Sequence, residues 1–333
     1  MRADILIIGQ GLAGTMIGWE CERAGLAFEI VDQGHATAAT RVAAGIINPV
    51  TGRRLVKTWR VETLLSQAGE TYQRIGDALG VALWRELRVW RLFADDIERA
   101  AFQRKRQTGE LTPFVTEAGD EAGFWIERAA RVDLPTMLAA MRARWEAQGR
   151  LQVRRADPLA ESTQYAWVID CTGNQGARME LAGVLPWEFS KGEVLKIAVG
   201  GLDSKVVLNR RHWVMPAEVE AAWVGATHEP GVVDPTPTAV GRERLEESAR
   251  SLLGRDFHLV EHRAGVRVTL PDKLPAIGRI RSGVGVANAL GGKGALFAPM
   301  LAMEWVRLIR SGTPVDRELD AARFGLQPAR MGL

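Results

Sequence analysis

The sequence predicts an α/β fold (α+β overall), in which a parallel sheet covered by helices carries an inserted, mainly antiparallel sheet. Three observations support this prediction. The chain starts with a strand, a glycine turn, a helix and a second strand; several short strands follow one another in its second half; and another glycine turn and a long helix stand near its end. Strands that alternate with helices indicate parallel pairing, whereas consecutive short strands indicate an antiparallel sheet.

The elements before residue 150 follow from hydrophobic periodicity. The first strand is almost continuously aliphatic, which is typical of a strand buried on both faces. The last helix expected before residue 150 has Asp133 as its N-cap and Gly149 after its end. We expect, in order, a strand at 3–9, a helix from about Leu12 to Ala24, a strand at 27–33, a helix from Leu64 to Leu79, a strand-rich insertion over 84–127 and a helix from Asp133 to Gln148.

The second half predicts a strand at 165–173, then a meander of four short strands interrupted by a charged helix at about 243–253. Apolar strands and glycine turns occur again over 265–278 and 283–292. The last major helix is expected from about Gly294 to Arg310. The predicted discontinuous nucleotide domain comprises residues 1–83, 128–188 and 263–333, and the predicted inserted substrate domain comprises residues 84–127 and 189–262.

Composition narrows the class of protein. The 333 residues are 47% apolar and 25% charged, as in ordinary globular proteins. The net charge of +3 and pI near 9.1 are compatible with an anionic ligand but too weak to indicate a nucleic-acid partner. The two cysteines, Cys21 and Cys171, show no metal-ligand spacing, so we expect no metal and a reducing, cytoplasmic location. Without an apolar run of about 18 residues, no membrane span is expected.

A glycine motif follows the first strand. Gly9 permits the tight turn, Gly11 lets the backbone approach a pyrophosphate, and Gly14 lets the helix pack against the sheet. Asp32 ends the second strand, where an acid accepts hydrogen bonds from ribose hydroxyls and disfavours the extra phosphate of NADP. The motif predicts a Rossmann-like dinucleotide site, but by itself it leaves NAD and FAD as alternatives.

Six further blocks occur in a characteristic order and decide between these cofactors. They are RVAAGIINP (41–49), WVIDCTG (167–173), KGEVL (191–195), WVGATHE (223–229), AGVRVTLPDKLPAIG (264–278) and ALGGKGALFAPMLAMEWVRLI (289–309). Together they closely resemble the D-amino-acid oxidase-like family of FAD-dependent oxidoreductases over nearly the whole chain. That family includes glycine oxidase, sarcosine oxidase, D-amino-acid dehydrogenases and the oxidase domain of a wobble-uridine tRNA-modifying enzyme.

The resemblance implies FAD as cofactor and a small amine or amino acid as substrate. The implied enzyme is an FAD-dependent oxidase or dehydrogenase that oxidises a C–N bond by hydride transfer to flavin N5, followed by hydrolysis of the imine. The implied cofactor-binding residues are Gly9, Gly11, Leu12, Ala13, Gly14, Asp32, Gln33, Thr40, Arg41, Ala43, Ala44, Gly45, Cys171, Thr172, Gly173, Gly291, Gly292, Lys293, Gly294 and Ala295. Cys171 replaces the family's usual alanine, and we interpret it as a small buried residue rather than a redox group.

Two residues are candidates for catalysis. Arg267 matches the family arginine that clamps a substrate carboxylate at two points, and its alternative role is an ion pair with an acid such as Asp272. Val268 replaces a proline that is common in the family, which puts the local geometry in doubt. Lys293 could contact the flavin or substrate, or activate oxygen, or be solvated.

Other functional interpretations stay open. The same fold could act on a 2-hydroxy acid or on an amine carried by a modified tRNA base, or the chain could hold FAD without turnover. An NAD-dependent enzyme that uses only the first glycine turn is a further alternative, which the C-terminal glycine helix and the CTG block disfavour. Trp213 and Met215 either line the substrate site or belong to the core. The basic residues that follow the flavin loop either attract an anion or form a solvated face, which we favour: Arg41, Arg53, Arg54, Lys57 and Arg60.

Overall fold

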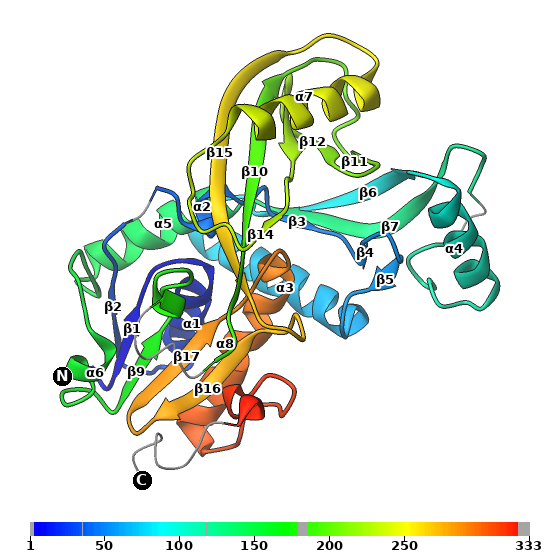
Figure 1. Cartoon of the computed structure of the whole chain (residues 1–333). Coiled ribbons are helices and arrows are strands. Elements are labelled where there is room, and N and C mark those ends of the chain that lie inside the picture. Colours follow the sequence, from blue (N-terminus) through cyan, green and yellow to red (C-terminus); the bar gives the residue numbers. More distant parts are fainter. Residues whose placement is uncertain (1–2, 35, 117–118, 179–184, 326–333) are drawn as a thin grey trace.

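The computed structural model describes residues 3–34, 36–116, 119–178 and 185–325. Figure 1 shows two sheets, one below the other, with long helices packed against the lower one. The lower sheet has the strand order β16-β17-β9-β1-β2-β8 and is parallel except for the β16–β17 pair. Its strands are β1 (Ile5–Ile8), β2 (Phe28–Val31), β8 (Leu151–Gln152), β9 (Trp167–Asp170), β16 (Ala276–Arg281) and β17 (Val284–Asn288).

The lower sheet lies in the interior of the protein, because its first strand carries apolar side chains on both faces. All four residues of β1 are buried, and β1 pairs in parallel with β2 on one side and β9 on the other. Helices pack around this sheet, and α8 contacts both α1 and α3. The helices of this part are α1 (Leu12–Arg23), α2 (Ala39–Val42), α3 (Val61–Leu79), α5 (Leu134–Ala147), α6 (Pro158–Glu161) and α8 (Gly294–Ser311), with short 3-10 turns at η1 (Gly176–Arg178) and η3 (Ala321–Phe324).

One proline interrupts the hydrogen bonding of α8 and is compensated by another helix. Pro299 lacks the N–H that would normally reach the carbonyl of Ala295, four residues earlier. The hydroxyl of Tyr72, on α3, donates to that carbonyl at 2.9 Å inside the core. Tyr72 is fully buried, so the pairing satisfies two polar groups that would otherwise be orphaned between the helices.

The upper sheet is mainly antiparallel. Its order is β14-β10-β13-β12-β11-β6-β7-β3, with β15 also paired to β10, and only the contact of β11 with β6 is parallel. Its strands are β3 (Ile46–Ile47), β6 (Trp84–Leu92), β7 (Gly123–Val132), β10 (Glu188–Ala198), β11 (Val206–Asn209), β12 (Trp213–Glu218), β13 (Ala221–Gly225), β14 (Glu229–Pro230) and β15 (His258–Thr269). Helix α7 (Ala239–Leu253) covers this sheet, and β4 (Val50–Thr51) forms a separate hairpin with β5 (Val56–Lys57).

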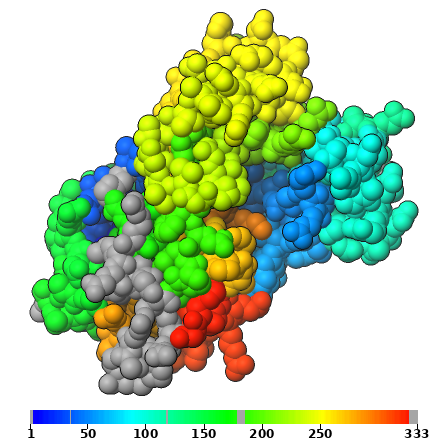
Figure 2. Space-filling view, in the orientation of Figure 1, coloured from blue at the N-terminus to red at the C-terminus, as the bar shows by residue number. Residues whose placement is uncertain are grey.

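The expected fold class is confirmed, and one expected element is wrong. The segment 84–127 is not only strand-rich, because a helix, α4 (Asp96–Gln107), stands between β6 and β7. Asp95 caps this helix by accepting the N–H of Glu98, and Phe102 is its main apolar anchor. In Figure 2 the segment projects to one side in cyan, while α7 and the start of β15 form a yellow lobe at the top.

Three of the four expected boundaries, at 127/128, 188/189 and 262/263, fall inside strands, and the second of these separates the first two residues of β10. Strand β7 continues to Val132 and pairs with β6 in the upper sheet. Strand β15 begins at His258 and pairs with β10 over its whole length, so residues 263–269 also belong to the upper sheet. The division of the chain into two domains stays a prediction, and β15 runs from the upper sheet toward the lower one (Figure 1).

Candidate active site

One cavity of about 1380 Å³ lies between the two sheets. It is larger than the usual 300–1,000 Å³ of small-ligand pockets, so it has room for a dinucleotide and a second molecule. Arg267 and all but one of the twenty residues expected to bind the cofactor line it. The exception is Gly14. Segments almost 290 residues apart in the sequence therefore meet around a single space.

Gly14 has the packing role that the sequence predicted. A Cβ atom at this position would lie 1.9 Å from the carbonyl oxygen of Gly9 and 3.1 Å from Cγ2 of Ile7. Gly9 itself has a φ of +101°, and its Cβ would stand 2.9 Å from the carbonyl oxygen of Cys171. The first and third glycines therefore let α1, β1 and the end of β9 approach one another.

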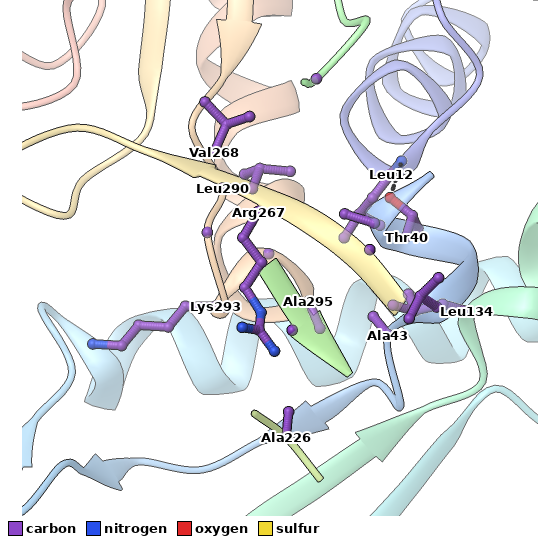
Figure 3. Close-up of a pocket in the computed structure, with 18 of the residues that line it drawn as sticks. Leu12, Thr40, Ala43, Leu134, Ala226, Arg267, Val268, Leu290, Lys293 and Ala295 are labelled. Atoms are coloured by element: carbon purple, nitrogen blue, oxygen red, sulfur yellow. Dashed lines mark hydrogen bonds between the residues drawn. The ribbon is translucent and has the colours of Figure 1, made fainter. Parts of the chain in front are cut away.

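The second glycine instead faces open space. At Gly11 the nearest atom to a Cβ would be Oγ1 of Thr40, 3.6 Å away, so the cavity rather than the protein occupies the position in front of it. Gly11 is the N-cap of α1 and offers no side-chain cap to the first-turn N–H groups. The N–H of Leu12 donates to Thr40 Oγ1 at 3.2 Å, the dashed contact in Figure 3.

A second helix begins at the same cavity. Lys293 is the N-cap of α8, again without a side-chain cap and without an acid in the first turn. Uncapped helix N-termini carry unsatisfied N–H groups and a partial positive charge. Two such ends on one cavity make it a favourable place for anionic groups, such as a pyrophosphate.

Asp32 lines the cavity as an ionised carboxylate. Burial tends to raise its pKa, but hydrogen bonds from the N–H of Gln10 (2.9 Å), Arg142 Nη1 (2.9 Å) and the N–H of Gly34 (2.7 Å) hold the pKa below its usual value. Sequence reasoning did not find Arg142, which lies on α5. A carboxylate fixed in this way still has oxygen lone pairs for ligand hydroxyls.

The Cys171–Gly173 turn is held by polar contacts behind it. Thr172 donates from its N–H and its hydroxyl to Asp170 Oδ1, at 2.9 and 2.6 Å, and Asn288 Nδ2 donates to the carbonyl of Gly173 at 2.9 Å. Burial raises the pKa of the Cys171 thiol well above its usual value. The thiol is therefore protonated, as expected of a small packing residue.

Arg267 is a half-buried cation without an acidic partner in the described part of the chain. Its Nη1 donates to the carbonyl of Thr227 at 3.3 Å, and burial lowers its pKa. The alternative pairing with Asp272 is wrong, because Asp272 accepts from Arg323 Nε at 2.8 Å. In Figure 3 the side chain of Arg267 runs from β15 toward the segment that contains Ala226.

A glycine on the neighbouring strand makes room for this guanidinium. A Cβ on Gly192 of β10 would lie 2.3 to 2.4 Å from the Nη2, Cζ and Nη1 atoms of Arg267. The planar group therefore rests on bare backbone, and Arg267 lines the cavity. An unpaired guanidinium in this position suits a carboxylate, which it can bind through two parallel hydrogen bonds.

Lys293 and Arg267 do not converge. Figure 3 shows the Lys293 side chain pointing away from the guanidinium of Arg267, although both residues line the cavity. Burial lowers the pKa of Lys293, and no described acid pairs with it. Of the other candidates, Trp213 lines the cavity, whereas Met215 is fully buried in the core.

The basic residues after the flavin loop are largely neutralised. Arg53 pairs with Asp95 at 2.5 Å, and Lys57 pairs with Glu62 at 2.7 Å. Arg60 contacts two acids, at 2.5 Å each. Of this group only Arg41 and Arg53 line the cavity. This favours the solvated-face interpretation for the rest.

His228 is a lining residue that sequence reasoning did not single out. Its Nδ1 lies 2.7 Å from the hydroxyl of Ser190, and burial together with the charges of Arg267 and Lys273 lowers its pKa. The imidazole is therefore neutral at pH 7. No metal-ligand spacing in the sequence points to His228. Its position near Arg267 depends on the pairing of β10 with β15, which sets Ser190 opposite Arg267.

Comparison with known proteins now identifies the family. The family model DAO, FAD dependent oxidoreductase, matches residues 4–308. The chain belongs to this family. It is an FAD-dependent oxidoreductase, and the resemblance and cofactor inferred from the sequence are confirmed.

Two DAO-family structures and one curated relative illustrate the likeness. Glycine oxidase from Geobacillus kaustophilus superposes with a TM-score of 0.77 at 20% identity, covering 98% of this chain and 99% of its own. Iminodiacetate oxidase from Chelativorans sp. BNC1 gives 0.75 at 20%, covering 94% and 96%. The tRNA 5-methylaminomethyl-2-thiouridine biosynthesis bifunctional protein MnmC of Hahella chejuensis is 25% identical over 95% of this chain, which spans 58% of that protein.

The residues present fit FAD. Gly11, Gly173 and Gly292 have no atom closer than 3.6 Å where a Cβ would stand, so each leaves room for a ligand. Asn174 lines the same space, and its Oδ1 atom is buried without a hydrogen-bond partner in the described residues. Together with the ionised Asp32 and the two open helix ends, these features match the ribose, phosphate and ring parts of a flavin dinucleotide.

No helix in the described residues is both long and apolar enough to cross a membrane, and no group of three potential metal ligands occurs in that part of the chain.

Proposed function

We propose that this DAO-family oxidoreductase oxidises the C–N bond of a small amine or amino acid. The observation that carries the proposal is Arg267, a half-buried guanidinium without an acidic partner among the described residues, on the wall of the cavity that fits FAD. Burying such a charge is costly unless something compensates it. A substrate carboxylate would supply the missing partner and fix the orientation of the molecule that carries it.

The cofactor-binding residues form the second part of the proposal. Gly9, Gly11, Leu12 and Ala13 would hold the pyrophosphate at the start of α1, where Gly14 lets the helix pack closely, and Asp32 would hold the ribose. The loop around Thr40–Gly45, the Cys171–Gly173 turn and the α8 end at residues 291–295 would enclose the rest. Bound FAD supplies the two-electron oxidation, and the α8 N-terminus would stabilise negative charge that develops on reduction.

The chain's own residues would then orient the substrate and exclude water. Arg267 would hold the carboxylate, while Trp213 and the valines of the upper sheet would supply an apolar wall. His228 is neutral, so it could hold a proton from the substrate's ammonium group. For Lys293 we propose a role toward the ring or toward oxygen, supported by its lowered pKa and lack of a described partner.

A second candidate substrate is an amine carried on a tRNA base. The names of the MnmC relatives favour it, because this chain matches them over 95% of its own length. It spans only 58% and 56% of those proteins, which leaves their remaining parts without a counterpart in this sequence.

The proposal is tested with the purified protein. We expect a yellow protein with a flavin spectrum that bleaches without oxygen when a carboxylate-bearing amine is added. The panel also contains 2-hydroxy acids and undermodified tRNA, and peroxide formed in air distinguishes an oxidase from a dehydrogenase. Bleaching by hydroxy acids or tRNA alone would overturn the amino-acid proposal.

Arg267→Lys tests the carboxylate site. Lysine keeps the charge but loses the two-point geometry, so kcat/KM should fall about tenfold to a hundredfold for carboxylate substrates. Amines without a carboxylate serve as the matched control. Equal losses for both kinds of substrate would mean that Arg267 has a structural role.

A further inference from the structure

The cavity extends past the proposed carboxylate site along the face of the upper sheet. Apolar side chains from four strands of that sheet line this part: Val194 on β10, Trp213 on β12, Val207 on β11 and Val89 on β6. Arg267 on β15 stands at one end of this wall. Polar residues stand at the other end, where β11 passes into the turn before β12.

Three consecutive residues form this far end, which we call the distal subsite: Asn209, Arg210 and Arg211. All three line the cavity. Asn209 is in register with Trp213 on one side and Arg91 on the other, so strand pairing fixes its position. Arg91 also lines the cavity, but its Nε donates to the buried acid Glu98 at 2.7 Å, so that its charge is compensated.

Asn209 lines the cavity and carries an acceptor atom without a partner in the described residues. Its side chain is 9% exposed, and its Nδ2 donates to the carbonyl of His212 at 3.2 Å. That contact fixes the orientation of the amide, because the opposite orientation would set two oxygens against each other. The Oδ1 atom is consequently free, and it is buried without a partner in the described residues. A ligand N–H or O–H group would satisfy it.

Arg210 and Arg211 add two positive charges. Both residues are exposed and neither forms an ion pair in the described part of the chain, although the charge of Arg211 helps to lower the pKa of Asp95. Arg210 has only a long contact, 3.5 Å, with the hydroxyl of Ser251 on α7. The neighbouring Arg53, by contrast, is already paired with Asp95. The distal subsite is therefore a cationic rim above a buried acceptor.

The separation of the two ends bears on the size of the substrate. Four strand-to-strand steps lead from β15 to β11 through β10, β13 and β12. At about 4.8 Å for each step, the two strands lie roughly 19 Å apart along the sheet. Side chains from both ends shorten the gap, but a molecule as small as glycine held at Arg267 does not reach Asn209.

We propose that the distal subsite binds an anionic extension of the amine substrate, a phosphate or carboxylate group on the side opposite to the carboxylate held by Arg267. This inference rests on the proposed function and names the substrate class more closely: an extended amine with an oxyanion at each end. Arg210 and Arg211 bind the distal oxyanion, and Asn209 accepts a hydrogen bond from an N–H or O–H group beside it.

N-substituted glycines test this proposal. The glycine carboxylate occupies Arg267, while an alkyl substituent of fixed length ends in a phosphate, a carboxylate, a hydroxyl or a methyl group. We expect the KM of the better anion-ended compound to be about tenfold below that of the hydroxyl-ended compound. The anion with the lower KM distinguishes a phosphate ester from a dicarboxylate.

Variants assign the effect to named residues. Arg210→Ala with Arg211→Ala should abolish the preference for anions and leave the KM of the methyl-ended compound within about twofold. Arg104→Ala with Arg106→Ala removes the same charge from the exposed end of α4, outside the cavity, and should keep the preference. Asn209→Leu should raise the KM of the hydroxyl-ended compound about fivefold.

Two results would overturn the distal subsite. One is a wild-type enzyme that does not discriminate between anionic and hydroxyl ends; the other is a double arginine variant that weakens all four compounds equally. Calorimetric titration of the same compounds separates this proposal from the proposed function. Selective binding without oxidation would refute the oxidation and support the subsite, whereas oxidation without anion preference would support the oxidation and refute the subsite.

Discussion

Gly192→Ala should disable the carboxylate site without replacing any polar residue. The new Cβ would stand 2.3 to 2.4 Å from three guanidinium atoms of Arg267, whereas non-bonded heavy atoms need about 3.5 Å. Arg267 must therefore shift by more than about 1 Å. The backbone tolerates alanine here because the residue lies within the regular β10 ladder and its φ is not positive. The side chain of Arg267, rather than the fold, absorbs the change.

The expected loss follows from the interaction that Arg267 would make. A hydrogen-bonded contact to a charged group contributes about 1.5–3 kcal/mol, so kcat/KM for a carboxylate-bearing amine should fall about 10- to 150-fold. Flavin reduction measured by stopped flow without oxygen gives this ratio. An amine without a carboxylate is the control and should change less than about twofold. The thermal midpoint should stay close to that of the wild type.

A double-mutant cycle supplies the refutation. Once Arg267→Ala has removed the guanidinium, Gly192→Ala has nothing to displace, and its effect should vanish in that background. The coupling energy should then equal the whole effect of the single glycine variant. If Gly192→Ala costs as much beside Arg267→Ala as it does alone, the reasoning that places the guanidinium over this glycine is wrong.

Two further predictions concern the stability of the scaffold. Tyr72→Phe leaves the buried carbonyl of Ala295 without a donor and should lower the free energy of unfolding by about 1–3 kcal/mol. Pro299→Ala in that background restores an N–H four residues along α8, and chemical denaturation should show that part of the lost stability is recovered. Glu193→Gln leaves the buried Lys191, its partner at 2.8 Å, uncompensated and should cost about 3–5 kcal/mol. Burial tends to raise the pKa of Glu193, but hydrogen bonds from Lys191 and neighbouring groups lower this pKa below the usual 4.5. The contribution of Glu193 to the free energy of unfolding is therefore complete above about pH 4.5 and is lost as the pH falls through the lower, folded-state pKa. Stability curves of wild type and Glu193→Gln that run parallel down to pH 3 would contradict this sign.

Local patterns made much of the fold and of the cavity lining predictable. The β1 run, the glycine turn and the Asp133 cap are decided within a few residues, and the structure has them where the sequence indicates. Helix α4 was missed because only Glu98 and Phe102 are buried in it, so its hydrophobic periodicity is weak. The helical indication was Asp95 with Glu98 three residues later, a capping pair that needs no apolar stripe.

The features that could not be predicted depend on contacts between distant segments. The sequence shows that Arg267 follows a family pattern, but not that Asp272 is already paired with Arg323. It also gives no indication that Asn209 faces the same cavity as Arg267, because three other strands separate their strands in the sheet. Such pairings come from the order of strands, which short-range periodicity does not encode.

Strand β10 joins the site to the scaffold through simple alternation. Ser190, Gly192 and Val194 line the cavity, while Lys191 and Glu193 are buried and bond to each other at 2.8 Å. Successive side chains of a strand point to opposite faces, so the run SKGEV separates a ligand face from a charged, buried face.

The buried face is anchored by α7 and β15. Glu193 accepts the hydroxyl of Thr238, the N-cap of α7, at 2.8 Å, and lies 2.6 Å from His262 Nε2 on β15. The N–H of Glu193 also donates to Thr227 Oγ1 at 2.9 Å, and the carbonyl of Thr227 receives the guanidinium of Arg267. The buried ion pair thus fixes the peptide that supports the proposed carboxylate clamp. Glu193→Gln should accordingly raise the KM of carboxylate substrates as well as lower stability, whereas a purely structural role would leave that KM unchanged in the folded fraction.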